Sequence, residues 1–231
     1  VKIGDKLITK AGELFDEEKL FSNENPAKIE IKRMPFVSRG GFKLEHAIKE
    51  FNINLKDKIC IDLGASTGGF VDCMLQNGAK KVYAIDVGYN QLAWKLREDK
   101  RVISIEKTNV KNCSFNDIFK KENVLEDELP DFMSGDLSFI SIKKVLNNVL
   151  KFVKKEALMV FLIKPQFEAG KDEIQKGGVV KDEKIHQKII EDIKDFALSL
   201  NLEIKGVVKS PIQGAKQGNT EFLICFLKRE K

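Results

Sequence analysis

Residues 59–70, Ile-Cys-Ile-Asp-Leu-Gly-Ala-Ser-Thr-Gly-Gly-Phe, decide the fold of this chain. An apolar run with strand character leads directly into a glycine-rich turn, and a helical pattern follows over 70–77. Small residues in such a turn let the backbone approach a ligand closely. Asp62 stands near the end of the strand, where its carboxylate could hold a polar or cationic group of that ligand. The stretch therefore predicts a strand–turn–helix unit with a ligand at the turn.

The pattern after residue 70 alternates between strand and helix. Further strand-like runs lie at 82–86, 102–106, 132–136 and 158–164, and helical patterns lie at 91–98, 142–154 and 182–200. Such alternation predicts a mostly parallel sheet with helices on both faces, that is, a doubly wound, Rossmann-like α/β fold. Two final strands, 203–209 and 221–228, are joined by a glycine-rich turn, and we expect the last strand to be antiparallel.

Two local features add detail to this pattern. Leu44, Ala47 and Ile48 share one face of a helix that begins after Ser38, whose hydroxyl is a suitable N-cap. Trp94 falls at helical spacing within 91–98 and is expected to pack against the protein. Both features are compatible with helices that cover the sheet.

The first 33 residues differ from the rest of the chain. Short extended runs alternate with turns there, and apolar residues are too few for an independent core. A chain of 231 residues can hold one large domain and a small appendage. We therefore expect an appendage at 1–33 and a main domain at 34–231.

Composition excludes several classes of protein. Charged residues make up 32% of the chain, the longest apolar runs, such as 158–163, are too short to span a bilayer, and no signal peptide is predicted. The four cysteines show no C-x-x-C spacing, which argues against zinc and against a disulfide framework; Cys60 and Cys225 are expected to be small buried hydrophobes. The net charge of +5 mildly favours a polyanionic partner. We expect a cytoplasmic protein with no membrane contact and no metal.

The ligand of the glycine turn is expected to be a cationic nucleoside. The turn lacks the G-x-G-x-x-G spacing of dinucleotide sites, and a pyrophosphate is poorly suited to a neighbouring carboxylate. S-adenosylmethionine, with its sulfonium and ammonium groups, suits Asp62 better. Asp86 ends the next strand 24 residues later, where an acidic residue grips ribose hydroxyls in this fold class, and Asn109 could face the adenine. The alternative is a turn that only packs a helix on the sheet, with Asp86 as a surface cap.

Four charged residues far apart in the sequence could form a reactive group: Lys43, Asp136, Lys164 and Glu221. Because the carboxyl ends of parallel strands meet at one edge of the sheet, Asp136 and Lys164 should point into the same crevice, and Glu221 joins them if the last strand is antiparallel. An amine is a poor base at its ordinary pKa, and both burial and a neighbouring ammonium lower that pKa. Lys164 could then activate a hydroxyl without a metal, Asp136 could orient it, and Lys43 with Glu221 could support the network. The alternative is four solvated surface charges.

Several longer stretches carry a resemblance to a known family. They are VSRGGFKLEHA (37–47), IDLGASTGGFVDCMLQNGA (61–79), VYAIDVGYNQLAWKLREDKRV (82–102), DLSFISI (136–142), LIKPQFEAG (162–170), KGGVV (176–180) and SPIQGAKQGNTEFL (210–223). In these stretches the chain resembles the haemolysin A (TlyA) family of ribosomal RNA methyltransferases, which have an FtsJ-like catalytic domain. The resemblance covers most of the chain from Pro35 onward.

The resemblance implies specific roles. It implies a catalytic K-D-K-E tetrad of Lys43, Asp136, Lys164 and Glu221. It also implies S-adenosylmethionine contacts from Gly64, Gly68, Phe70, Asp86, Asn109 and Asp136, to which we add Asp62 and Ser66 of the glycine turn as expected cofactor contacts. It also implies methylation of ribose 2′-hydroxyls, on cytidines of ribosomal RNA, by an FtsJ-like domain at 34–231. The appendage at 1–33 resembles part of an S4-type RNA-binding module or a linker. Ribosomal RNA or ribosomal subunits are the implied partner, and a monomer is slightly favoured.

Three other functions remain open at this level. A non-catalytic RNA-binding or ribosome-assembly factor could keep the scaffold, although it would not need two inward-facing lysines. A membrane-lysing haemolysin is suggested by the name of the family, but the chain has no amphipathic or spanning segment that supports it. Methylation of a base amino group usually requires an Asp/Asn-Pro-Pro-Tyr type of segment, whereas the chain has Asp136-Leu-Ser-Phe139.

Overall fold

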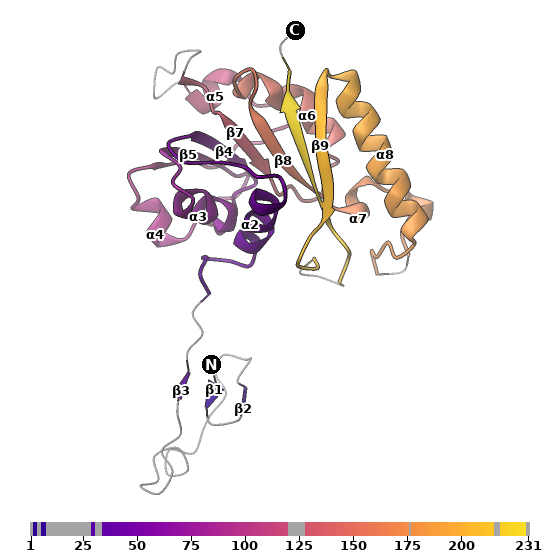
Figure 1. Ribbon diagram of the computed structural model, residues 1–231, viewed down its shortest axis with the longest axis horizontal. Coiled ribbons are helices and arrows are strands. Elements are labelled where there is room, and N and C mark those ends of the chain that lie inside the picture. The colour runs from indigo at the N-terminus through magenta and orange to yellow at the C-terminus, as the bar shows by residue number, and fades with distance from the viewer. Residues whose placement is uncertain are drawn as a thin grey trace, which may run out of the picture. The chain divides into compact units, whose positions relative to one another are not determined.

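The computed structural model describes residues 34–119, 128–175, 177–214 and 218–229, together with three short strands ahead of them (Figure 1). The chain divides into two units, Val1–Pro35 and Phe36–Lys231. In the first unit, β1 (Lys2–Ile3) pairs antiparallel with both β2 (Lys6–Leu7) and β3 (Ile29–Glu30). The prediction of an RNA-binding module at 1–33 lies mostly outside the described residues and stays a prediction.

The second unit is built on one seven-stranded sheet with the order β6-β5-β4-β7-β8-β10-β9. The strands are β4 (Ile59–Leu63), β5 (Lys81–Ile85), β6 (Val102–Ile105), β7 (Phe132–Gly135), β8 (Leu158–Ile163), β9 (Leu202–Lys209) and β10 (Phe222–Lys228). Strands β4 to β8 pair in parallel, while β10 is antiparallel to both of its neighbours, β8 and β9. The predicted fold class, mostly parallel with an antiparallel last strand, is confirmed.

Helices cover both faces of this sheet (Figure 1). They are α2 (Gly40–Glu50), α3 (Gly69–Gln76), α4 (Trp94–Arg97), α5 (Phe115–Phe119), α6 (Lys143–Val149), α7 (Pro165–Glu168) and α8 (Glu183–Ser199), with 3₁₀ turns η2 (Leu150–Phe152) and η3 (Lys171–Glu173). Successive strand residues serve opposite faces: Cys60 packs in a core with α2, α3 and α4, whereas Ile61 packs in a second core with α5, α6 and α8. The sheet is buried on both sides, as expected of a parallel sheet.

Some local predictions are wrong. Arg39, in a helical conformation, occupies the N-cap position of α2, and no side-chain cap bond is formed; the Ser38 hydroxyl faces Gly69 of α3 instead. Trp94 is 74% exposed rather than packed, because α4 is only one turn long and buries Leu96. The short helices α5 and α7 were not predicted, since four or five residues are too few for a periodic pattern.

Cysteines, apolar helices and clusters of metal-binding side chains bear on the class of protein that the composition predicts. All four cysteines are buried and free, which confirms Cys60 and Cys225 as small buried residues. In the described residues, no helix is long and apolar enough to cross a bilayer. Nor do those residues contain a cluster of three or more His, Cys, Asp or Glu side chains that could hold a metal ion.

Candidate active site

The site lies at the carboxyl ends of β4 and β7, which are adjacent in the sheet although β5 and β6 separate them in sequence. This is the point where the strand order reverses, and ligands of doubly wound sheets bind there. A cavity of about 290 Å³ opens beside these strand ends, and a second of about 550 Å³ adjoins it toward β5. Gly64, Ser66, Asp136 and Ser138 line both cavities, which therefore form one continuous site.

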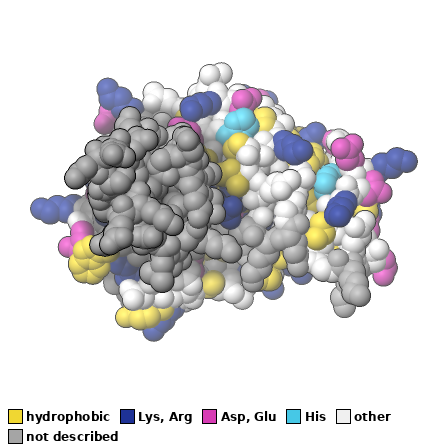
Figure 2. Space-filling view, turned by 90° about the horizontal axis from the view of Figure 1, so that it is seen from below, with side chains coloured by type: hydrophobic (Ala, Val, Ile, Leu, Met, Phe, Trp, Pro, Cys, Tyr) yellow, Lys and Arg dark blue, Asp and Glu magenta, His cyan; other side chains and the backbone are white. Residues whose placement is uncertain are grey.

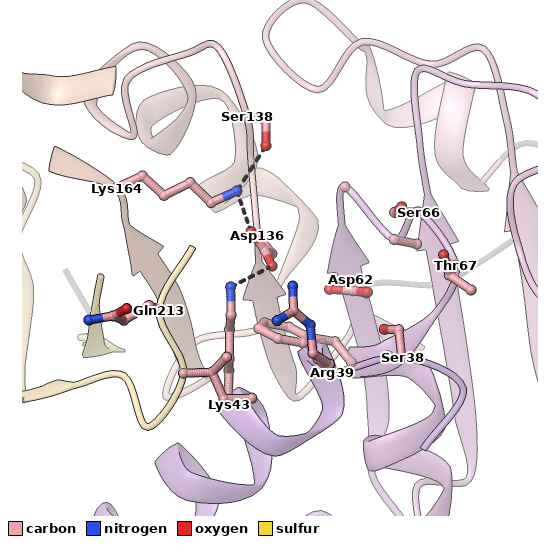
Figure 3. A pocket seen from close by; sticks show the side chains of 16 residues that line it. Ser38, Arg39, Lys43, Asp62, Ser66, Thr67, Asp136, Ser138, Lys164 and Gln213 are labelled. Carbon is pink, nitrogen blue, oxygen red and sulfur yellow. Dashed lines mark hydrogen bonds and ion pairs between the residues drawn. The ribbon is translucent and has the colours of Figure 1, made fainter. Parts of the chain in front are cut away.

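The structure brings the four reactive residues into one chain of contacts. Lys43 Nζ donates a hydrogen bond to Glu221 Oε2 at 2.7 Å and lies 3.6 Å from Asp136 Oδ2. Lys164 Nζ forms an ion pair with Asp136 Oδ1 at 2.6 Å. Figure 3 shows Asp136 between the two ammonium groups, each joined to it by a dashed line. The network thus runs from Glu221 through Lys43 and Asp136 to Lys164.

Each member reaches the network from a different element. Lys43 stands in the first turns of α2, Asp136 follows β7, and Lys164 follows β8. Glu221 directly precedes β10, and because β10 is antiparallel, its start lies at the same edge of the sheet. Glu221 does not line either cavity; it lies behind Lys43 and contacts the site through it.

Burial makes the pairing of these charges necessary. Lys43 and Lys164 are each 9% exposed and Glu221 is 3% exposed. A buried charge without a partner is strongly destabilising, whereas two ammonium and two carboxylate groups can compensate one another. The four groups are therefore a matched set and not the solvated surface charges of the alternative interpretation.

Sequence reasoning missed several polar residues of the smaller cavity, among them Ser138, Arg39 and Gln213. Ser138 accepts a hydrogen bond from Lys164 Nζ at 2.8 Å, and Arg39 and Gln213 line the cavity from α2 and from the loop between β9 and β10 (Figure 3). All three lie inside stretches that carry the family resemblance. No sequence pattern pointed to these residues individually, because only the folded chain shows which of these side chains face the cavity.

Asp62 is a buried carboxyl group at the floor of the site. It is 1% exposed, and the Ser134 hydroxyl donates a hydrogen bond to Oδ1 at 2.5 Å. Burial raises the pKa of Asp62 to about 7; the bond from Ser134 opposes this shift, and the charges of Asp136 and Asp86 add to it. A cationic ligand beside Asp62 would favour the ionised carboxylate and so relieve part of the desolvation cost.

The glycine turn has two positions that require glycine. Gly64 has φ +81°, and a Cβ there would lie 2.9 Å from the backbone oxygen of Asp136. Gly68 has φ +96°, and a Cβ there would meet Leu92 and Leu96. Gly68 lines neither cavity, so it shapes the turn from behind, whereas Gly64 and Phe70 face the smaller cavity. The turn therefore brings the backbone of Gly64 against that of Asp136.

Asp86 and Asn109 both line the larger cavity, and both also hold local backbone. Asp86 accepts hydrogen bonds from the N–H groups of Ser66 and Gly88, each at 2.7 Å, and Asn109 Oδ1 accepts one from Lys111. Each carboxylate oxygen retains a second lone pair that a ligand hydroxyl could use. Asp86 therefore does cap local backbone, as the alternative interpretation predicts, and it can still accept a hydrogen bond from a ligand.

The residues that line the two cavities fit a ligand that is cationic at one end and carries a ribose and an aromatic base at the other. Asp62 and Asp136 surround the smaller cavity, where a cation is favoured. Asp86 stands at the larger cavity, whose apolar lining includes Ile85, Val110 and Leu137. These are the properties of S-adenosylmethionine, so the residues present fit the cofactor that the sequence predicts.

Comparisons with known proteins show the family of the chain. A family model for FtsJ-like methyltransferases matches residues 36–228. The chain is 42% identical over 224 residues to Hemolysin A of Brachyspira hyodysenteriae, covering 97% of this chain and 87% of that protein. It is 39% identical over 189 residues to 16S/23S rRNA (cytidine-2′-O)-methyltransferase TlyA of Mycobacterium tuberculosis, covering 82% and 67%. Among solved structures, a candidate hemolysin from Lactococcus lactis has a TM-score of 0.79 and 46% identity, covering 86% of this chain and 91% of the other.

Proposed function

Because the chain belongs to the FtsJ-like methyltransferase family, we propose that it transfers a methyl group from S-adenosylmethionine to a ribose 2′-hydroxyl of ribosomal RNA. The observation that carries this proposal is the contact chain from Glu221 to Lys164, which ends at a cavity continuous with the predicted cofactor site. The relative named as a cytidine-2′-O-methyltransferase supports a cytidine as the target nucleoside.

Each residue of the quartet has a different role in the proposed reaction. The bound cofactor supplies a methyl group on a positively charged sulfur. Lys164 lines the cavity. Once its ammonium has released a proton to solvent, the neutral amine receives the proton that leaves the 2′-hydroxyl as the bond from the methyl group to the ribose oxygen forms and the bond from the methyl group to sulfur breaks. Asp136 holds Lys164 through its 2.6 Å ion pair, and Lys43 holds Asp136 from the other side. Glu221 compensates the positive charge of Lys43. The negative charge of Asp136 therefore remains available to Lys164.

The cofactor is held by the residues predicted for it. We assign the cationic end to Asp62 and Asp136, the turn contacts to Gly64, Ser66 and Phe70, and the ribose and base to Asp86 and Asn109, with Gly68 shaping the turn. All except Gly68 line the two joined cavities. Asp62 lines only the smaller cavity and Asp86 only the larger one, whereas Asp136 lines both, so the cationic end and the ribose are each given a carboxylate of their own.

The RNA partner is proposed to be ribosomal RNA or a ribosomal subunit, which places the activity in the cytoplasm. Figure 2 shows that Lys and Arg side chains of the described residues lie scattered on the face in view, with carboxylates between them. On this face the described residues do not form one basic patch. We propose that 34–231 is the catalytic domain and that 1–33 contributes RNA binding as part of an S4-like module or as a linker.

Methyl transfer from labelled S-adenosylmethionine to ribosomal subunits and to naked ribosomal RNA tests the function directly. We expect one labelled nucleotide class, with the methyl group on the ribose of a cytidine, as shown by nucleotide mapping. A methyl group on a base amino group would contradict the proposal and favour the base-methylating alternative. Binding of subunits without any transfer would favour the assembly-factor alternative.

Cofactor affinity should depend on pH through Asp62. Its pKa is raised to about 7, so in the free protein it carries a proton below that pH and is ionised above it. Only the ionised form attracts a cationic ligand. The affinity should therefore rise as pH increases toward about 7, by at most about tenfold per unit, and level off above it.

Calorimetric titration with S-adenosylmethionine between pH 5.5 and 8.5 measures this dependence. Asp62→Asn is the matched control, because it keeps the size of the side chain and removes its titration. The variant should bind more weakly at pH 8 and lose the part of the pH dependence that Asp62 causes. Identical profiles for the two proteins would show that Asp62 does not titrate against the ligand.

A further inference from the structure

Ser138 is a polar residue of the site that belongs neither to the predicted tetrad nor to the predicted cofactor contacts. Its hydroxyl accepts a hydrogen bond from Lys164 Nζ at 2.8 Å, on a different side from Asp136 Oδ1 (Figure 3). Resting on the proposed function, we propose that Ser138 is a positioning residue that holds the Lys164 amine in the direction of the acceptor hydroxyl. It acts through Lys164.

Two partners restrict a lysine far more than one. The side chain of Lys164 has four rotatable bonds, and a single carboxylate contact leaves its amine free to pivot around that carboxylate. The 2.8 Å hydrogen bond to Ser138 fixes one of the three bonding directions of Nζ, and the 2.6 Å ion pair holds the amine at Asp136 by charge, because Asp136 Oδ1 accepts no hydrogen bond within the described residues. With the amine held in this way, its remaining bonding directions are available to the cavity that Lys164 and Ser138 both line.

The backbone around Ser138 is held in a conformation that needs support. The next residue, Phe139, has φ +63°, a left-handed value that is a genuine outlier for a bulky side chain. Strain of this kind persists only where the surrounding structure holds it, and it concentrates at functional sites. The turn after Asp136 is therefore a constrained feature that places the Ser138 hydroxyl.

A ring contact joins this turn to the segment that carries Lys164. Phe139 packs against Phe167 of α7 with ring centroids 5.0 Å apart, and the Phe167 ring lies 5.9 Å from Lys164 Nζ. Phe139 is 87% exposed, so core burial does not explain its position. The ring contact instead joins segment 136–139 to segment 164–167. The hydrogen bond from Lys164 to Ser138 connects the same two segments.

The position of Ser138 also suits this role. Its side chain is exposed and lines both cavities, so it stands where the cofactor site meets the cavity of the acceptor. The charged groups that face Lys164 in the described residues are Asp136 and, beyond it, Lys43. Loss of the Ser138 hydroxyl would leave Asp136 as the single polar partner of Lys164 there.

The test compares Ser138→Ala with Ser138→Thr, which keeps the hydroxyl and adds one methyl group at an exposed position. Ser138→Ala should lower single-turnover methyl transfer by about 10- to 100-fold, as displacement of a reacting group does, with the Kd for S-adenosylmethionine and the KM for RNA within about twofold of wild type. Ser138→Thr should restore most of the rate. A raised cofactor Kd in Ser138→Ala, wild-type transfer by it, or no rescue by threonine would overturn the proposal.

A second measurement does not depend on activity. In ¹⁵N-lysine NMR of the whole protein, the Lys164 ammonium signal should be protected from solvent exchange in wild type and Ser138→Thr but broadened in Ser138→Ala, while the Lys43 signal is unchanged. Equal protection in Ser138→Ala would refute the positioning role even if no RNA were methylated. An inactive wild type with the expected NMR pattern would refute the proposed function alone.

Discussion

Replacing Lys164 by alanine should lower methyl transfer by about 10²- to 10⁴-fold, the range expected when a group that moves a proton in the transition state is lost. Lys164 and Lys43 both contact Asp136 and line the smaller cavity, but Lys164 makes the shorter contact with Asp136, at 2.6 Å, whereas the short hydrogen bond of Lys43 goes to Glu221. The fold should survive, because Asp136 keeps Lys43 as a partner and its side chain is 24% exposed to water. Cofactor affinity should change by no more than about threefold, since the other predicted contacts remain.

Lys164→Arg sharpens this prediction. A guanidinium can preserve the ion pair with Asp136, yet it does not release its proton in proteins. The variant should therefore be nearly as inactive as Lys164→Ala while remaining as stable as wild type. Lys188→Ala is the matched control, because it removes a 60% exposed lysine that pairs with Glu173 at 2.7 Å on the surface. Undiminished transfer by either Lys164 variant would rule out Lys164 as the activating group.

Gly64→Ala should weaken cofactor binding and with it methyl transfer. The new Cβ would lie 2.9 Å from the backbone oxygen of Asp136, and backbone cannot yield as a flexible side chain does. Either the turn withdraws from β7 or Asp136 shifts, and both changes deform the site. We expect a cofactor Kd raised by about tenfold or more and transfer lowered by about 100-fold or more.

Gly177→Ala separates this effect from simple backbone strain. Gly177 has φ +92°, close to the +81° of Gly64, but a Cβ there would meet nothing within 4 Å. Its substitution should cost only the left-handed strain of about 1–2 kcal/mol of unfolding free energy, with cofactor Kd unchanged. Calorimetry for binding and thermal unfolding for stability measure both variants. Equal cofactor Kd values for Gly64→Ala and wild type would show that the turn does not hold the cofactor.

The sequence by itself determined the architecture, because strands, turns and helices depend on residues that are close together in the chain. The run 59–70 specifies a strand, a turn and a helix, and similar runs repeat until 164. Asp136 and Lys164 follow strands β7 and β8, and the parallel pairing of these strands brings them to one edge. This part of the site followed from topology alone.

Only the tertiary structure decided how the quartet is connected. Lys43 and Glu221 are 178 residues apart, and their 2.7 Å contact depends on how α2 packs beside the start of β10. The hydrogen bond that Lys164 donates to Ser138 depends in addition on a strained turn and on a ring contact between separate segments. Local patterns carry no information about such contacts, because they form only when distant segments are packed together and buried charges must find partners.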